Sequence, residues 1–138
     1  MDSIMTIDDA VMMAGLIRAL VRTCYEQVLQ GQLALHVRHE LLRAANWHAA
    51  RYGLGSQLID PLNERPRSAK DTLQQFLLLL RPALEAHNDW EEVSNHVYRI
   101  LKEGTGAARQ RAVYQRTGNL QDVVDFVVAE TAKGTTPR

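Results

Sequence analysis

The chain has 138 residues, enough for one domain that buries a core of its own. Hydrophobic residues make up 46% of it and charged residues 23%, which is typical of a globular protein and excludes a disordered one. Lysine and arginine together number 16, as do aspartate and glutamate, so the formal net charge is zero. This balance excludes a nucleic-acid binder held mainly by neutralising phosphates, and it makes a protein partner or self-association unsurprising.

The first predicted helix begins at Thr6, whose side chain can cap it, and Asp8 and Asp9 favour its positive N-terminal end. Gly31 is suited to end it. Apolar residues recur in between at steps of three and four and form one long stripe: Ile7, Ala10, Val11, Ala14, Ile17, Val21, Cys24 and Val28. Because Cys24 lies in that stripe, we expect it to be a small buried hydrophobic residue.

A second helix is predicted from about residue 32 to Tyr52, with Gly53 as its terminator. Its apolar positions have helical spacing: Leu35, Leu42, Ala45 and Ala49. Two amphipathic helices separated by a short break predict an antiparallel helical hairpin over residues 6–52.

Residues 53–67 are predicted to form a connecting loop, because glycine, proline and asparagine recur there. Leu58 and Ile59 suit a short extended piece that packs on the helices. Ser68 can then cap a third helix, in which Pro82 is expected to introduce a kink or an end. The predicted buried face of this helix consists of large apolar residues: Leu73, Phe76, Leu77, Leu80 and Leu84.

Three more helices are predicted after the third. Asn88 or Asp89 can cap a helix with one apolar face, made of Trp90, Val93, Val97, Ile100 and Leu101. A Gly-Thr-Gly break at residues 104–106 precedes a short helix over about residues 107–116. Asn119, with Asp122 three residues later, resembles a capping box for a last helix that ends near Ala132.

The last of these segments is rich in valine, which also suits a strand, but the cap and the spacing favour a helix. Residues 133–138 are predicted to be a loose tail. The sequence therefore predicts a single all-α domain over residues 1–138, a bundle of about five to six helices with the C-terminal helices at 68–132.

The N-terminus lacks a basic segment followed by an apolar core, so no secretory signal is expected. The longest apolar stretches are much shorter than a membrane-spanning helix requires. We therefore expect a cytoplasmic protein that contacts neither a membrane nor nucleic acid.

Few side chains suit catalysis or metal binding. His36 and His39 can share a helix face, but their spacing differs from that of zinc-protease motifs, and solvated histidines explain them. Cys24 has no visible activating base, and as the single cysteine it excludes an internal disulfide. The sequence predicts no catalytic residue and no metal ligand.

The segment Asn46–Leu54 is the most unusual part of the chain. Asn46 lies near one helix face, while Trp47 and Arg51 lie along another. Two interpretations of Arg51 stay open: it stacks on Trp47 as a structural cation–π pair, or its planar guanidinium binds a phosphate or carboxylate.

A second cationic cluster consists of Arg109, Gln110, Arg111 and Arg116. A solvated helix face is the favoured interpretation, and anion binding is the alternative. The Gly-Thr-Gly turn at residues 104–106 is explained by helix capping, although a glycine-rich turn before a helix can also present N–H groups to an anion.

Several motifs resemble type 2 glutamate–cysteine ligases, the bacterial carboxylate–amine ligases. The stretch Asn46–Leu54, followed by Leu58–Asp60, resembles the family's Asn-Arg-Trp-x-Ala-Ala-Arg-Tyr-Gly-Leu…Leu-Ile-Asp segment, and Gly104–Gln110 resembles its Gly-Thr-Gly-Ala-x-Arg-Gln element. The segments from Asp2 to Val11 and from Thr117 to Thr131 are similar as well. The sequence departs from the family pattern at three positions: Trp47 directly follows Asn46, and alanine occupies positions 45 and 108.

The resemblance implies an ATP-dependent ligase of glutamine-synthetase-like fold, which phosphorylates a glutamate carboxyl group and lets an amine displace the phosphate. It also implies ATP and Mg²⁺ for the complete enzyme, with the metal ligands on an N-terminal antiparallel sheet. The chain would correspond to the helical last third, which binds neither cofactor alone. Arg51, Asn46, Arg109 and Gln110 are the residues that the resemblance implicates in binding substrate or phosphate.

Two functions follow as hypotheses. The chain is either the C-terminal helical portion of such a ligase, inactive without the sheet portion, or a non-catalytic helical module or truncated remnant. In both cases a helix face that packs on the sheet elsewhere in the family would be exposed or covered by dimerisation.

Overall fold

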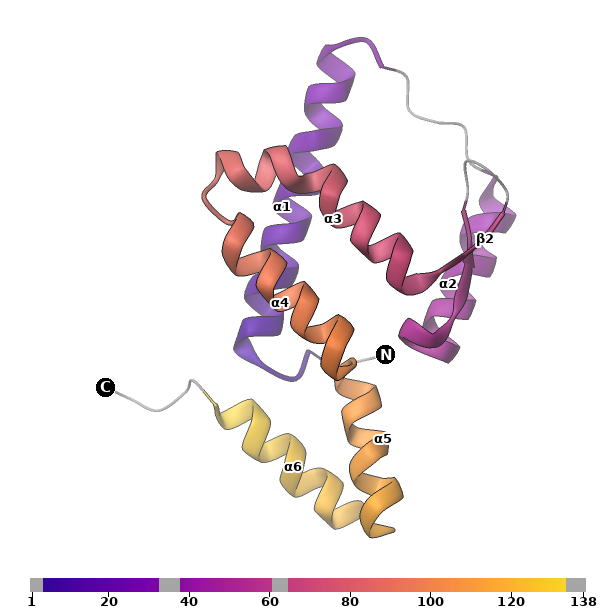
Figure 1. The fold of residues 1–138 in the computed structure, drawn as a ribbon, viewed down its shortest axis with the longest axis vertical. Coiled ribbons are helices and arrows are strands. Elements are labelled where there is room, and N and C mark those ends of the chain that lie inside the picture. The colour runs from indigo at the N-terminus through magenta and orange to yellow at the C-terminus, as the bar shows by residue number, and fades with distance from the viewer. Residues whose placement is uncertain (1–3, 33–37, 61–64, 134–138) are drawn as a thin grey trace.

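The computed structural model describes residues 4–32, 38–60 and 65–133. Within these ranges the chain forms six α-helices, one 3₁₀ turn and a two-stranded antiparallel sheet, so the predicted all-α bundle is confirmed (Figure 1). In chain order the elements are α1 (Ile7–Leu29), α2 (His39–Tyr52), η1 (Gly53–Gly55), β1 (Gln57–Ile59), β2 (Pro66–Ser68), α3 (Ala69–Ala86), α4 (Trp90–Glu103), α5 (Gly106–Thr117) and α6 (Leu120–Ala132).

The predicted starts of α1, α3, α4, α5 and α6 agree with the structure, although the Asp89 side chain makes no capping hydrogen bond at α4. The Asp9 N–H donates to Thr6 Oγ1 at 3.1 Å and the Thr6 N–H donates to Asp9 Oδ2 at 3.2 Å, which completes a capping box at α1. Ser68 caps α3 in the predicted way. At α6 the predicted capping box is wrong in one detail. The Asn119 side chain caps the helix, but it accepts from the N–H of Gln121 instead of the N–H of Asp122.

The predicted hairpin over residues 6–52 is wrong for the described part of the chain. Helix α1 packs against α3 and α4, whereas α2 packs against β1 and η1 (Figure 1). Helix α2 starts at His39, later than predicted, and Leu35 and His36 lie outside the described residues. Helix α2 has no completely buried residue, whereas α3 has five.

The core forms around α3. Leu77, Leu80 and Leu84 are fully buried, as predicted, and Leu73 and Phe76 pack at the edge. Pro82 does not end α3, which continues to Ala86 and changes direction in its C-terminal part (Figure 1). The partners of α3 in the core come from α1 and α4: Met12, Leu16, Ala19, Val93 and Val97.

The apolar stripe predicted on α1 lies on the exposed side of the helix. Ile17 is 56% exposed and Val21 64%, and Cys24 is exposed rather than buried. The buried face instead contains Gly15 and Ala19, whose small size allows α1 to lie close to its neighbours. Because apolar residues surround α1 on nearly all sides, periodicity alone does not identify the face that packs.

Replacing Gly15 by alanine is expected to lower the free energy of unfolding by about 1 kcal/mol or more. A Cβ atom at this position would lie 2.8 Å from Cγ2 of Val93, a short and buried side chain that cannot move aside. Chemical denaturation measures the loss, which here outweighs the helix propensity gained with alanine. The double variant Gly15→Ala/Val93→Ala should show a favourable coupling, and strictly additive losses would contradict the proposed clash.

Helices α5 and α6 pack against each other in the lower part of Figure 1. Met5 connects them to the start of α1: its side chain is buried, and its carbonyl oxygen accepts from Thr131 Oγ1 at 3.0 Å. The valine-rich last element is helical, as predicted. Across the described ranges, each helix is too short or too polar to cross a membrane.

Candidate functional site

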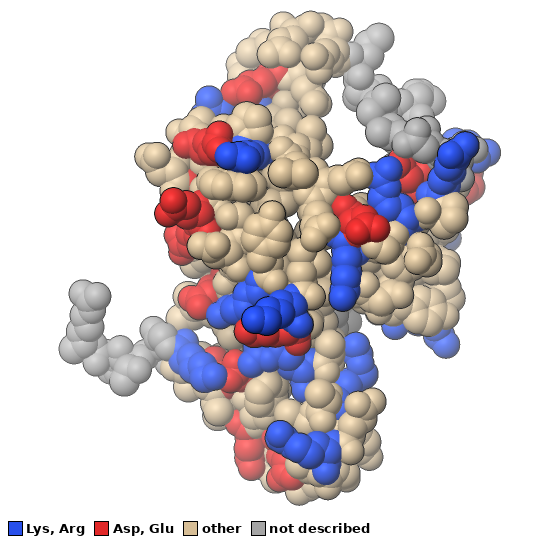
Figure 2. Space-filling model, in the orientation of Figure 1, with Lys and Arg blue, Asp and Glu red and all other residues tan. Residues whose placement is uncertain are grey.

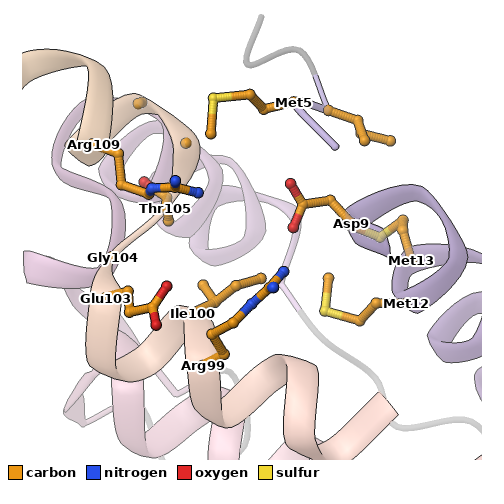
Figure 3. A pocket seen from close by; sticks show the side chains of 13 residues that line it. Met5, Asp9, Met12, Met13, Arg99, Ile100, Glu103, Gly104, Thr105 and Arg109 are labelled. Carbon is orange, nitrogen blue, oxygen red and sulfur yellow. The ribbon is translucent and has the colours of Figure 1, made fainter. Parts of the chain in front are cut away.

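A cleft lies where the start of α1 and the end of α4 meet the turn into α5 (Figure 3). Its cavity has a volume of about 210 Å³. Isoleucine and methionine side chains form the apolar part of the wall, and charged side chains project into it from three helices. The charged lining residues are Asp9, Arg99, Glu103 and Arg109.

The turn in the wall of this cleft is built by the Gly-Thr-Gly sequence. Gly104 has a φ of +94°, a conformation that favours glycine, and its N–H donates to the Ile100 carbonyl at 2.8 Å to end α4. Thr105 starts α5 by accepting the Ala108 N–H. At Gly106 a Cβ would make an ordinary van der Waals contact with Met5, at 3.6 Å. The capping interpretation of this motif is therefore correct.

Arg109 lies in the first turn of α5 and is held on two sides. Its Nη2 donates to Glu130 Oε2 at 2.6 Å, and its guanidinium lies 5.3 Å from the ring centroid of Phe126. Lys133 also donates to Glu130, and the Lys133 and Arg109 hydrogen bonds hold the pKa of this carboxyl group below its usual value. Figure 3 shows the Arg109 guanidinium on the cleft side of α5, facing Asp9. This arrangement presents a fixed planar cation to the cleft.

Across the cleft, Asp9 pairs with His96. Asp9 Oδ1 lies 2.7 Å from His96 Nε2, and Arg99 Nη2 lies against the same ring, 3.0 Å from Nε2 and 3.1 Å from Nδ1. Burial raises the pKa of Asp9, but the hydrogen bonds from His96 and Thr6 together lower the pKa by more than burial raises it. The pKa of Asp9 is therefore below its usual value.

The sequence did not identify this pair. Asp9 and His96 are 87 residues apart, and each has an ordinary local explanation, Asp9 as a helix-start acid and His96 as an isolated histidine. Only the packing of α1 on α4 brings the two side chains together.

The variant Asp9→Asn should have a lower free energy of unfolding than the wild type at neutral pH, and this difference should disappear in acid. The pKa of Asp9 is lower in the folded state, so its ionised form stabilises the fold fully above the ordinary value of about 4 and stops doing so as the pH falls through the folded pKa. Unfolding curves from neutral pH to about pH 3 should therefore show the wild type and the variant converging in acid. A difference that does not change with pH would contradict this prediction.

The structure places the predicted site residues on two separate helices. Arg109 lines the cleft, and Gln110 follows it on α5, with its Nε2 at 4.0 Å from Met5 Sδ. Asn46 and Arg51 are exposed residues of α2 and are not among the described residues that line the cleft. The Arg51 guanidinium lies 5.6 Å from the ring centroid of Trp47 and 5.7 Å from that of Tyr52, so the cation–π contact is present.

The described residues do not form a metal site. Among them, no three histidine, cysteine, aspartate or glutamate side chains come together as a ligand set. His39 is exposed at the start of α2, and its predicted neighbour His36 falls outside the described ranges.

The fold and the cleft define a helical unit with a cleft lined by charged side chains, and among its described residues no three metal-ligating side chains come together. Residues 1–126 match the sequence model of "Glutamate-cysteine ligase family 2 (GCS2)". The chain belongs to this family, as its motifs predict. No solved structure matches it.

Three relatives show the extent of the similarity. Proteins of Frankia alni and Frankia casuarinae, each provisionally named glutamate–cysteine ligase 2-2, are 40% and 42% identical over 99% and 94% of the chain. A protein of Mycolicibacterium smegmatis with the same provisional name is 43% identical over 95% of it. The chain covers 36%, 15% and 33% of these three relatives respectively, so it corresponds to a minor part of each.

Proposed function

We propose that the chain is the C-terminal helical portion of an ATP-dependent carboxylate–amine ligase and acts together with the remaining portion of such an enzyme. The observation that carries the proposal is the family match, which extends over nearly the whole chain but over a minor part of each relative. The chemistry is the one the motifs imply: a glutamate carboxylate takes the γ-phosphoryl group of ATP. The amine nitrogen then forms the C–N bond as the C–O bond to phosphate breaks and the amine loses a proton.

In this function Arg109 binds a carboxylate or phosphate group at the cleft. Glu130 and Phe126 fix its guanidinium, so little side-chain freedom is lost on binding an anion. Gln110 is adjacent and supplies an amide. ATP and Mg²⁺ are held by the remaining portion, where the family resemblance places the metal-binding carboxylates.

Arg51 and Asn46 have a second proposed role on α2. Their exposure allows contact with an anionic group of the remaining portion or of a substrate, at the expense of the Arg51–Trp47 contact. A cytoplasmic location is part of the same proposal, because ATP and amino acids are available there.

Reconstitution tests the proposal. The full chain is mixed with the part of the Mycolicibacterium smegmatis relative that lies outside the matched region, together with ATP, Mg²⁺, glutamate and cysteine. We expect ADP release from the mixture and none from either component alone. Absence of ADP release, under conditions in which the intact relative releases it, would overturn the proposal.

A second candidate is a non-catalytic helical module. It is favoured by the exposed apolar side chains along α1, which suit an interface with another protein. In the reconstitution experiment this function predicts a folded chain that neither binds the remaining portion nor changes its activity.

A further inference from the structure

One side of α1 carries exposed residues in the alternating steps of four and three that characterise coiled-coil seams. We call this side the outer face of α1, and it consists of Ile7, Val11, Ala14, Arg18, Val21, Tyr25 and Val28. Tyr25 is 63% exposed and Val28 67%, so their apolar atoms lie in water. The C-terminal end of α1, at the top of Figure 2, shows mainly uncharged side chains.

A groove of about 310 Å³ runs beside the N-terminal half of this face. It is hollow because Ala14 and Gly15 have almost no side chain. Its walls come from α1 and from the start of α4: Val11, Ala14, Gly15, Arg18, Asp89, Glu92 and Val93. One end is polar, since Arg18 forms an ion pair with Asp89 there.

The residue that fits this groove is Tyr25 of a second copy. Tyr25 follows Ala14 by eleven residues and Arg18 by seven, which at 100° per residue places all three within about 20° of one direction on the helix. Tyr25 and the groove therefore lie on one face of α1, roughly 16 Å apart along the helix. We propose that two copies of the chain pair through antiparallel α1 helices, each placing its Tyr25 in the groove of the other.

The antiparallel direction follows from the positions of Tyr25 and the groove on α1. It sets large Tyr25 opposite small Ala14 and pairs Val11 with the partner's Val28. A parallel pair would set Tyr25 against the partner's Tyr25 and leave both grooves empty. In the antiparallel pair the two copies are related by a two-fold axis, so the two contacts between Tyr25 and a groove are identical, as in closed dimers.

The charges of the groove also suit a tyrosine. Arg18 is the single charged residue of the outer face, and Asp89 neutralises it, so Glu92 is the charged group of the groove that the partner has to satisfy. The Arg18 guanidinium can face the phenol ring, and the carboxylate of Glu92 can accept the phenol hydroxyl. The helix has 23 residues, or roughly 35 Å, which is a small interface, and we expect a dissociation constant on the order of micromolar.

Analytical ultracentrifugation of the full chain tests the pairing. The unchanged chain should shift from monomer to dimer with concentration, and Tyr25→Ser or Ala14→Leu should weaken the dimer at least about tenfold. The matched control is Tyr114→Ser on α5, a tyrosine that is 47% exposed outside the outer face, and it should dimerise normally. Circular dichroism checks that each variant is folded. A monomer at every concentration up to about 1 mM, or normal dimerisation of Tyr25→Ser, would overturn the proposal.

Disulfide trapping tests the direction. In a Cys24→Ser background, Val11→Cys and Val28→Cys single variants should form no disulfide dimer alone and should form one when mixed. Each single variant contains one cysteine, so any disulfide that forms joins two copies. Cross-linking of either single variant alone, or none in the mixture, would overturn the antiparallel pairing. The proposed pairing would also be overturned if Tyr25→Ser weakened only the binding of the remaining ligase portion, because that portion, and not a second copy, would then bind the outer face of α1.

Discussion

The variant Leu77→Ala is expected to lower the free energy of unfolding by about 2–5 kcal/mol, a large part of the total stability of a domain of this size. Leu77 is fully buried at the centre of α3, among residues that α1 and α4 contribute to the core. The substitution removes the transfer free energy of the lost carbon atoms and leaves a cavity that helices packed on both sides cannot close.

The matched control for this effect is Leu78→Ala, the same substitution at the next residue of the same helix. Leu78 is 56% exposed, so its loss should change the free energy of unfolding by about 0.5 kcal/mol or less. Urea denaturation followed by circular dichroism measures both variants. Equal losses at the two positions would contradict the placement of Leu77 in the core.

The variant Arg109→Ala is expected to reduce ADP release by the reconstituted ligase about 100-fold. Arg109 is one of two arginines that line the cleft, and its two anchors hold it there without the cost of ordering a flexible side chain. Arg109→Lys should recover only part of the activity, because an ammonium group keeps the charge but loses the planar pair of donors. Initial rates at saturating ATP measure the effect.

Arg81→Ala is the control for Arg109. Arg81 also stacks on an aromatic ring, that of Trp90 at 4.8 Å, and also pairs with a carboxylate, that of Glu85 at 2.7 Å, but it is not a lining residue of the cleft. Its loss should leave the rate of the reconstituted enzyme within about twofold of the unchanged one. If Arg81→Ala and Arg109→Ala lowered the rate equally, the effect would be structural, and Arg109 would have no specific role in binding.

Figure 2 shows positive and negative side chains intermixed in the lower half of the molecule, around the junction of α4 and α5. This mixture explains how a chain of zero net charge can still have a local excess of positive charge beside the cleft. Arg109 and Lys133 both pair with Glu130, so two cations share one carboxylate there. A local binding function for Arg109 is thus compatible with a composition that excludes a broadly basic surface.

The sequence alone determined the helices that start and end with clear local signals. Thr6, Ser68 and Asn119 mark three of the starts, and the face of α3 at Leu77, Leu80 and Leu84 is correct because these residues recur at steps of three and four. The motifs that indicated the family are also local, since they depend on residue types at short spacing.

Only the tertiary structure decided which side of α1 is buried and which residues meet at the cleft. α1 is apolar on nearly every side, and the small residues Gly15 and Ala19, rather than the more apolar stripe, allow the close approach to α3 and α4. The Asp9–His96 pair joins residues 87 positions apart, so no local pattern contains it. Helical periodicity reports where apolar residues lie on one helix, whereas contact between helices depends on the shape of both.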